Sequence, residues 1–207
     1  GAISITAGAV IDLNGQTMAT PKSLTLNGTG INSGGALINS SATPVTYAGL
    51  VTLGSSSSII ANYGAITLSN TGSITGSGKA LTLGGSTGGA LASIIATDAG
   101  TLTKLGAGTW TLNGANTYTG GTTITAGYLA LGSSTALPSG GDVTVNGTLN
   151  LNGYSATVGG LSGSGSVVNT RNIMQNNLVL YFDPSNKMSY PGSGTTLYNL
   201  AAFSTGA

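Results

Sequence analysis

One short pattern recurs along most of this chain: a hydrophobic residue, a polar residue, a second hydrophobic residue, and then Asn-Gly or another turn pair. Close copies lie at residues 12–15, 25–28, 111–114, 144–147 and 150–153, and variants at 51–54, 66–69 and 81–84. Alternation with a period of two predicts strands, and Gly and Asn between the runs predict tight turns. Strands this short and turns this frequent favour a coil whose successive turns stack on one another over an antiparallel meander.

The spacing of the copies is irregular, which constrains the coil. Leu53, Leu68 and Leu83 lie fifteen residues apart, whereas Leu83 and Leu112 are separated by nearly twice as much. Turns of two or three strands, some of them degenerate, would produce this spacing. We expect Leu, Ile and Val to stack inside the coil, Thr and Ser to face outwards, and Gly and Asn to occupy the corners. We further hypothesise that corner Asn side chains form hydrogen bonds along the stack.

Composition limits the class of protein. Hydrophobic residues make up 40% of the chain, charged residues only 4%, and the net charge is +1. A disordered chain would combine low hydrophobicity with high net charge, so a folded β-protein is favoured. Five scattered cations cannot form the basic patch of a nucleic-acid binder. No apolar run approaches the ~20 residues of a membrane-spanning helix. The opening Ala-Ile-Ser-Ile already has a strand pattern and no signal peptide, so we expect a mature product or a piece of a longer chain.

Residues 102–132, LTKLGAGTWTLNGANTYTGGTTITAGYLALG, hold the densest set of strand patterns. This stretch resembles the passenger-associated β-strand repeat of autotransporter passengers and other large secreted bacterial proteins. The matching residues are 102–104, 106–109, Leu112, 114–124, 126–127 and 129–132. The resemblance implies a right-handed parallel β-helix on the outside of a cell or particle, and it does not imply an enzyme. Looser copies extend it, so we predict an all-β fold with this β-solenoid over residues 1–168.

The composition changes after this predicted solenoid. Residues 169–176 are interpreted as a linker. Residues 177–207 resemble the opening of the laminin-G-like, concanavalin-type jelly rolls that are common in phage virion proteins. The matching residues are 178–181, Asp183, 189–196 and Leu200. A complete jelly roll needs about eight strands, so we predict a partial jelly-roll-like segment and favour continuation of the natural chain beyond Ala207.

Catalysis has little chemistry to use in this sequence. Glycoside hydrolysis needs two carboxylates close together. The only acids are Asp12, Asp98, Asp142 and Asp183, and each stands in a turn pattern where it can bond its own backbone. A Ser nucleophile lacks a histidine base, and no motif supports Lys104 in that role. Asp183 with Asn186 offers too few oxygen ligands for calcium. We therefore predict no catalytic residue, no cofactor and no metal.

The aromatic residues are the remaining candidates for contacts. Trp110 alternates with Thr109 and Thr111 at a position that sister copies fill with Leu, which predicts a core residue. Tyr118, Tyr128 and Tyr154 stand near predicted turns. We predict that these three tyrosines are exposed aromatic contacts for a glycan or a protein partner.

Two functional classes follow, both non-enzymatic and extracellular. The first is a structural fibre subunit of a phage virion, supported by the jelly-roll-like tail. The alternative is a secreted bacterial adhesin of the autotransporter type, and a polysaccharide-degrading β-helix enzyme is a distant third. Expected partners are further copies of the chain, as a homo-oligomer or an end-to-end fibre, other virion or surface proteins, and cell-surface glycans. Nucleic acid and membrane insertion are not expected.

Overall fold

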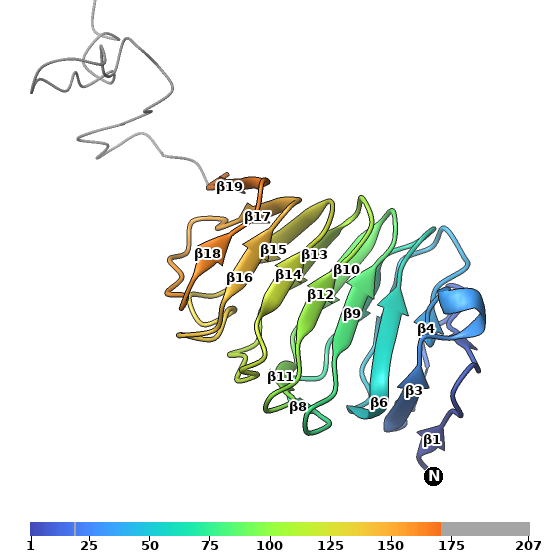
Figure 1. The fold of residues 1–207 in the computed structure, drawn as a ribbon. Coiled ribbons are helices and arrows are strands. Elements are labelled where there is room, and N and C mark those ends of the chain that lie inside the picture. The colour runs from blue at the N-terminus through green and yellow to red at the C-terminus, as the bar shows by residue number, and fades with distance from the viewer. Residues whose placement is uncertain (19, 171–207) are drawn as a thin grey trace, which may run out of the picture. The chain divides into compact units, whose positions relative to one another are not determined.

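The computed structural model describes residues 1–18 and 20–170, and they form a parallel β-solenoid (Figure 1). Every strand pair among them is parallel, as a coil requires. The predicted all-β solenoid is thus confirmed, while its right-handed sense stays a prediction. The strands are β1 (Ile3–Ser4), β2 (Ile11–Asp12), β3 (Leu24–Gly28), β4 (Leu37–Ile38), β5 (Val45–Tyr47), β6 (Val51–Ile60), β7 (Ile66–Leu68), β8 (Ser73–Thr75), β9 (Leu81–Gly84), β10 (Gly88–Leu91), β11 (Ile94–Ala96), β12 (Leu102–Lys104), β13 (Thr109–Leu112), β14 (Thr122–Ile124), β15 (Tyr128–Leu131), β16 (Val143–Val145), β17 (Thr148–Asn150), β18 (Leu161–Ser162) and β19 (Ser166–Val168).

Two long sheets run along the coil. One contains twelve strands, and its main path is β1-β3-β6-β9-β12-β14-β16-β18; the other contains seven, in the order β5-β7-β10-β13-β15-β17-β19. From β12 to β19 consecutive strands of the chain alternate between the two sheets, and each pairs with the strand one turn away in its own sheet. The short strands β2, β4, β8 and β11 pair off the main path.

The register gives the length of a turn. Leu81 pairs with Leu102, Leu102 with Thr122, and Thr122 with Val143, so these turns take 20 or 21 residues. The irregular spacing in the sequence now has an explanation. Leu53, Leu68 and Leu83 belong to β6, β7 and β9, so a step of fifteen residues moves from one sheet to the other and does not complete a turn.

Aliphatic side chains stack inside the coil as expected. Leu26 lies beside Leu53 in the next turn, and both are buried. Trp110 confirms its predicted place in the core: it is fully buried, it pairs with Leu129, and its indole Nε1–H donates to the carbonyl oxygen of Gly84 at 3.0 Å. Gly89, on the other side of Trp110, contributes no side chain, which leaves room for the large ring.

Glycine occupies corners where the backbone comes very close to the backbone of the adjacent turn. Gly85 has a φ of +109°, and a Cβ there would lie 2.0 Å from the carbonyl oxygen of Ala61. Only glycine can occupy such a corner without moving the adjacent turn. A short 3₁₀ helix (Ile31–Ser33) and a register shift between Leu26 and Gly28 show that the first turns are less regular.

Residues Gly1–Asn169 form one compact unit, and its last strand ends at Val168. The predicted jelly-roll-like segment at 177–207, and all but the first two residues of the predicted linker at 169–176, lie outside the described residues. In the part that the structure does describe, no helix has the length and apolar character to span a bilayer.

Candidate functional site

The three predicted tyrosine contacts have different environments. The prediction that Tyr118 is exposed is wrong: only 1% of its surface is accessible, and its hydroxyl lies 2.6 Å from Thr122 Oγ1. Burial raises the pKa of the Tyr118 phenol, although the hydrogen bond with Thr122 acts in the opposite direction. Tyr154 is partly buried and packs against the core. Tyr128 alone is well exposed, at 48%.

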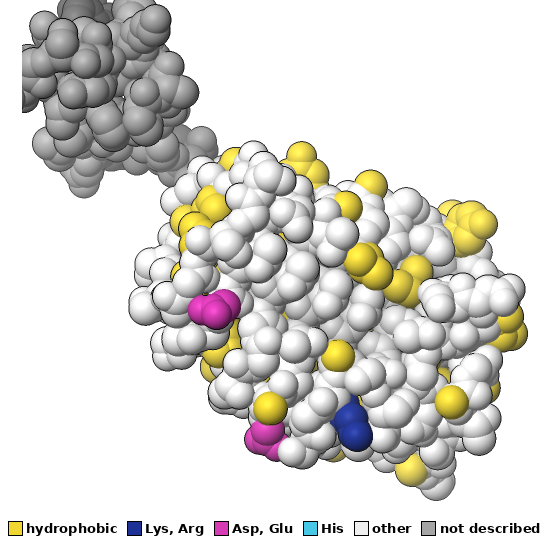
Figure 2. Space-filling model, in the orientation of Figure 1, with side chains coloured by type: hydrophobic (Ala, Val, Ile, Leu, Met, Phe, Trp, Pro, Cys, Tyr) yellow, Lys and Arg dark blue, Asp and Glu magenta, His cyan; other side chains and the backbone are white. Residues whose placement is uncertain are grey.

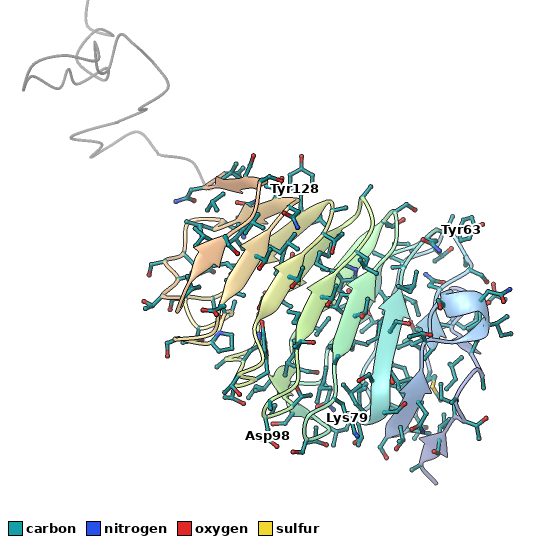
Figure 3. The ribbon with its side chains drawn as sticks, in the orientation of Figure 1. Tyr63, Lys79, Asp98 and Tyr128 are labelled. Atoms are coloured by element: carbon teal, nitrogen blue, oxygen red, sulfur yellow. The ribbon has the colours of Figure 1, made fainter. Side chains whose placement is uncertain are left out.

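A second exposed aromatic side chain was missed from the sequence. Tyr63 is 68% exposed, and it lies with Tyr128 along the same edge of the coil (Figure 3). Lys79 and Asp98 are on the opposite edge of that view. On the face drawn in Figure 2, charged side chains are few, and hydrophobic ones are dispersed singly or in small groups. Single exposed hydrophobic residues are normal on protein surfaces and do not define a site.

Two of the three described acids stand at turns, as expected: Asp12, whose carboxylate bonds the backbone of the following turn, and Asp98. Asp12 accepts hydrogen bonds from the N–H of Asn14 at 2.9 Å and of Ser40 at 3.0 Å. Partial burial alone would raise the pKa of Asp12, but the bonds from Ser40 and Asn14 outweigh it, so the pKa lies below its ordinary value. Asp98 occupies a turn with a φ of +51°, and Asp142 immediately precedes β16. Asp183 lies outside the described residues.

Lys104 is buried inside the coil, and within residues 1–18 and 20–170 no ion pair with an acid is found for it. Its Nζ donates to three carbonyl oxygens, those of Leu105 at 2.8 Å, Gly106 at 2.7 Å and Ala126 at 3.1 Å. Burial lowers the pKa of Lys104 to about 8. These three bonds make Lys104 a clamp between its own turn and the next. The burial of Lys104 could have been predicted from the sequence, because Lys104 occupies the inward position that Leu83 and Ile124 fill in adjacent turns.

The hypothesis of Asn bonding along the stack is confirmed in a modified form. The side-chain amide donates to a backbone carbonyl of the preceding turn, and does not pair with another Asn. Asn27 Nδ2 donates to Ile5 O at 2.8 Å, and Asn70 Nδ2 donates to Ala48 O at 3.0 Å. Asn27, Asn70 and Asn152 therefore each tie their own turn to the preceding one.

Asn116 extends this arrangement into the interior. Its Oδ1 accepts from the N–H of Ile95 at 2.7 Å, and its Nδ2 donates to the carbonyl oxygen of Ala136 at 2.6 Å. One buried side chain thus bonds the turns before and after its own. Among the described residues β11 pairs only with β8, and the side chain of Asn116 supplies a hydrogen bond on the other side of β11, where a further strand would pair.

The chemistry available on this surface is that of hydroxyl and amide groups. Within residues 1–18 and 20–170, no three His, Cys, Asp or Glu side chains lie close enough together to hold a metal. The exposed groups can form neutral hydrogen bonds and small apolar contacts, which suits recognition.

Comparisons with known proteins support the autotransporter resemblance. Residues 102–131 match the family model of the passenger-associated-transport-repeat. The chain is also similar to the adhesin BmaC autotransporter of Brucella suis biovar 1 (strain 1330), with 37% identity over 104 residues. That match covers 48% of this chain and 3% of the length of that adhesin. No solved structure matches the chain.

These matches change the order of the two functional hypotheses. They favour the autotransporter-type adhesin, which was the alternative, over the phage virion subunit, which was the first interpretation. Neither match supports a virion protein. The virion hypothesis depended on the tail from residue 177 onward, which lies outside the described residues. The resemblance to the passenger repeat, in contrast, coincides with a regular part of the coil.

Proposed function

We propose that this chain is part of the passenger of a secreted bacterial adhesin, exposed outside the cell and without catalytic activity. The observation that carries the proposal is the match of residues 102–131 to the passenger repeat, which coincides with strands β12 to β15 of the solenoid. The similarity to a protein named as an autotransporter adhesin supports the adhesive role.

The physical properties of the coil suit this role. Backbone ladders run along its whole length, and a solenoid gains stability from each added turn. A nearly uncharged surface also avoids long-range repulsion from either anionic or cationic partners, so binding would depend on short-range fit. Length and a repeated surface would therefore provide the function, with no need for a reacting group.

The test is surface display of the full chain on a non-adherent bacterial strain. We expect the displaying cells to adhere to cultured epithelial cells more strongly than cells that carry the display anchor alone. Protease treatment of intact cells would verify that the solenoid is folded and outside. A folded, displayed chain that gives no adherence above the anchor alone would contradict the proposal.

A further inference from the structure

A groove of about 310 Å³ lies where the loops of three successive turns meet. Its lining comes from the loop after β13, the loop after β15 and the loop after β17. Adjacent turns of a parallel solenoid are about 4.8 Å apart, so the groove extends about 10 Å along the coil. That length and volume fit a short oligosaccharide or a similar small ligand.

The groove exists because regular pairing stops at this point. Asn116 uses its side chain to bond Ile95 on one side and Ala136 on the other. The loop that follows β15 adds no strand to the ladder of β8 and β11, although Thr135 O accepts a hydrogen bond from the N–H of Asn116 at 3.1 Å. It forms its own turns instead, with the N–H of Gly141 donating to Pro138 O at 3.3 Å. These bonds, together with the fixed φ of Pro138, form one wall of the groove before any ligand arrives.

The lining combines an apolar floor with a hydroxyl rim. Leu137 is buried and Pro138 is half-buried, whereas Thr117, Thr135 and Thr157 are exposed. Ser134 and Ser139 add two more exposed hydroxyls. No lining residue is charged.

This lining selects the chemical class of the ligand. A charged ligand would lose its hydration without gaining an opposite charge, which is costly. A purely apolar ligand would cover the hydroxyls and leave them without partners. A sugar ring offers both a C–H face for Leu137 and Pro138 and a rim of hydroxyls for the Ser and Thr side chains.

The geometry points to this groove as a binding site for a neutral oligosaccharide. The inference builds on the proposed function, since it names the ligand class of the adhesive surface. It differs from the tyrosine contacts expected from the sequence, because none of the three predicted tyrosines lines the groove.

The experiment is saturation-transfer NMR on the full chain with cellotetraose, chitotetraose and maltotetraose, and with a heparin tetrasaccharide as the charged comparison. We expect at least one neutral tetrasaccharide to bind and the heparin fragment not to bind. Thr117→Trp should abolish the signal because the indole fills the groove. Thr125→Trp is the matched control, since Thr125 is also exposed in the adjacent strand-to-strand corner but does not line the groove.

A second, smaller substitution tests the groove with less risk of disturbing the fold. Thr135→Val keeps the shape and removes one hydroxyl, so binding should weaken about fivefold, the loss of one hydrogen bond. The inference is overturned if no neutral sugar binds, if the heparin fragment binds better, or if Thr117→Trp binds as the native chain does. Adherence of displaying cells separates the two proposals. If cells that display Thr117→Trp still adhere, the adhesin proposal stands and the groove proposal is overturned. If the native chain binds a neutral sugar but its cells do not adhere, the groove proposal stands and the adhesin proposal is overturned.

Discussion

The interior of the coil differs between the repeat segment, residues 102–131, and three strand segments of the preceding turns, β3, β7 and the first part of β6. In those three segments the inward positions are aliphatic and buried, while the buried polar side chains of the preceding turns, Asn39, Tyr47, Ser57 and Ser58, lie outside them. In the repeat segment, polar groups occupy the interior alongside Leu and Ile, and each has a hydrogen-bond partner. They are Lys104, Trp110, Asn116, Tyr118 and Thr122.

The difference shows two ways of holding one turn on the next. An aliphatic stack stabilises contact but tolerates small shifts, because the hydrophobic effect has no direction. A buried polar group is satisfied only when a particular backbone atom of the neighbouring turn faces it, and leaving it unpaired is costly. We infer that the bonds from Lys104, Trp110 and Asn116 to neighbouring turns fix the register between turns. Three predictions test how much the polar groups of this interior contribute to stability.

The largest effect is expected at Asn116. Asn116→Ala leaves the N–H of Ile95 and the carbonyl of Ala136 buried without partners, which should lower the free energy of unfolding by about 3 kcal/mol. Asn70→Ala is the matched control, because Asn70 also bonds the preceding turn but at the surface. It should cost about 1 kcal/mol. Denaturant unfolding gives both values, and hydrogen exchange at Ile95 should accelerate only in Asn116→Ala. Equal losses would refute the special role of the interior bond.

Lys104 should make stability depend on pH in an unusual direction. Its folded pKa of about 8 lies below the ordinary value of 10.5, so the unfolded state binds the proton more tightly. Stability should therefore rise as pH increases from 8 towards 10.5, as the folded state loses its buried charge. Relative to Lys104→Met, the native chain should gain about 2 kcal/mol between pH 7 and pH 10.

Comparison with the Met variant cancels the other titrating groups, which are common to both chains. Unfolding is measured with urea at several pH values, since urea does not alter the ionic strength. A difference between the two chains that stays constant with pH would mean that the three carbonyl oxygens stabilise the ammonium fully.

The sequence predicted the regular features well, for reasons visible in particular residues. The dense strand patterns of residues 102–132 predicted strands there, and the structure places β12 to β15 in this stretch. Alternation is a local property, so it can be recognised without knowledge of the fold. The burial of Trp110 followed from the same alternation.

Features that depend on neighbouring turns were missed. Gly114, Asn116 and Tyr118 are all buried while the residues between them are exposed, so the period of two continues through a stretch that looked like a turn. Gly and Asn normally indicate a corner. Here they led us to expect a turn at residues that in fact point into the core. The groove could not be predicted at all, because it depends on how three loops far apart in sequence pack together.

The smallest predicted effect separates two tyrosines that the sequence could not distinguish. Tyr118→Phe removes the hydroxyl that contacts Thr122 Oγ1 and leaves the buried threonine without that partner, so it should lower stability by about 1 kcal/mol. Tyr128→Phe changes an exposed side chain and should leave stability unchanged within about 0.5 kcal/mol. Thermal or urea unfolding of the two variants provides the measurement. If Tyr118→Phe proved as neutral as Tyr128→Phe, the hydrogen bond between Tyr118 and Thr122, which lies within one turn, would contribute nothing to stability. The polar contribution of the repeat segment would then come from the groups that bond a neighbouring turn, Lys104, Trp110 and Asn116.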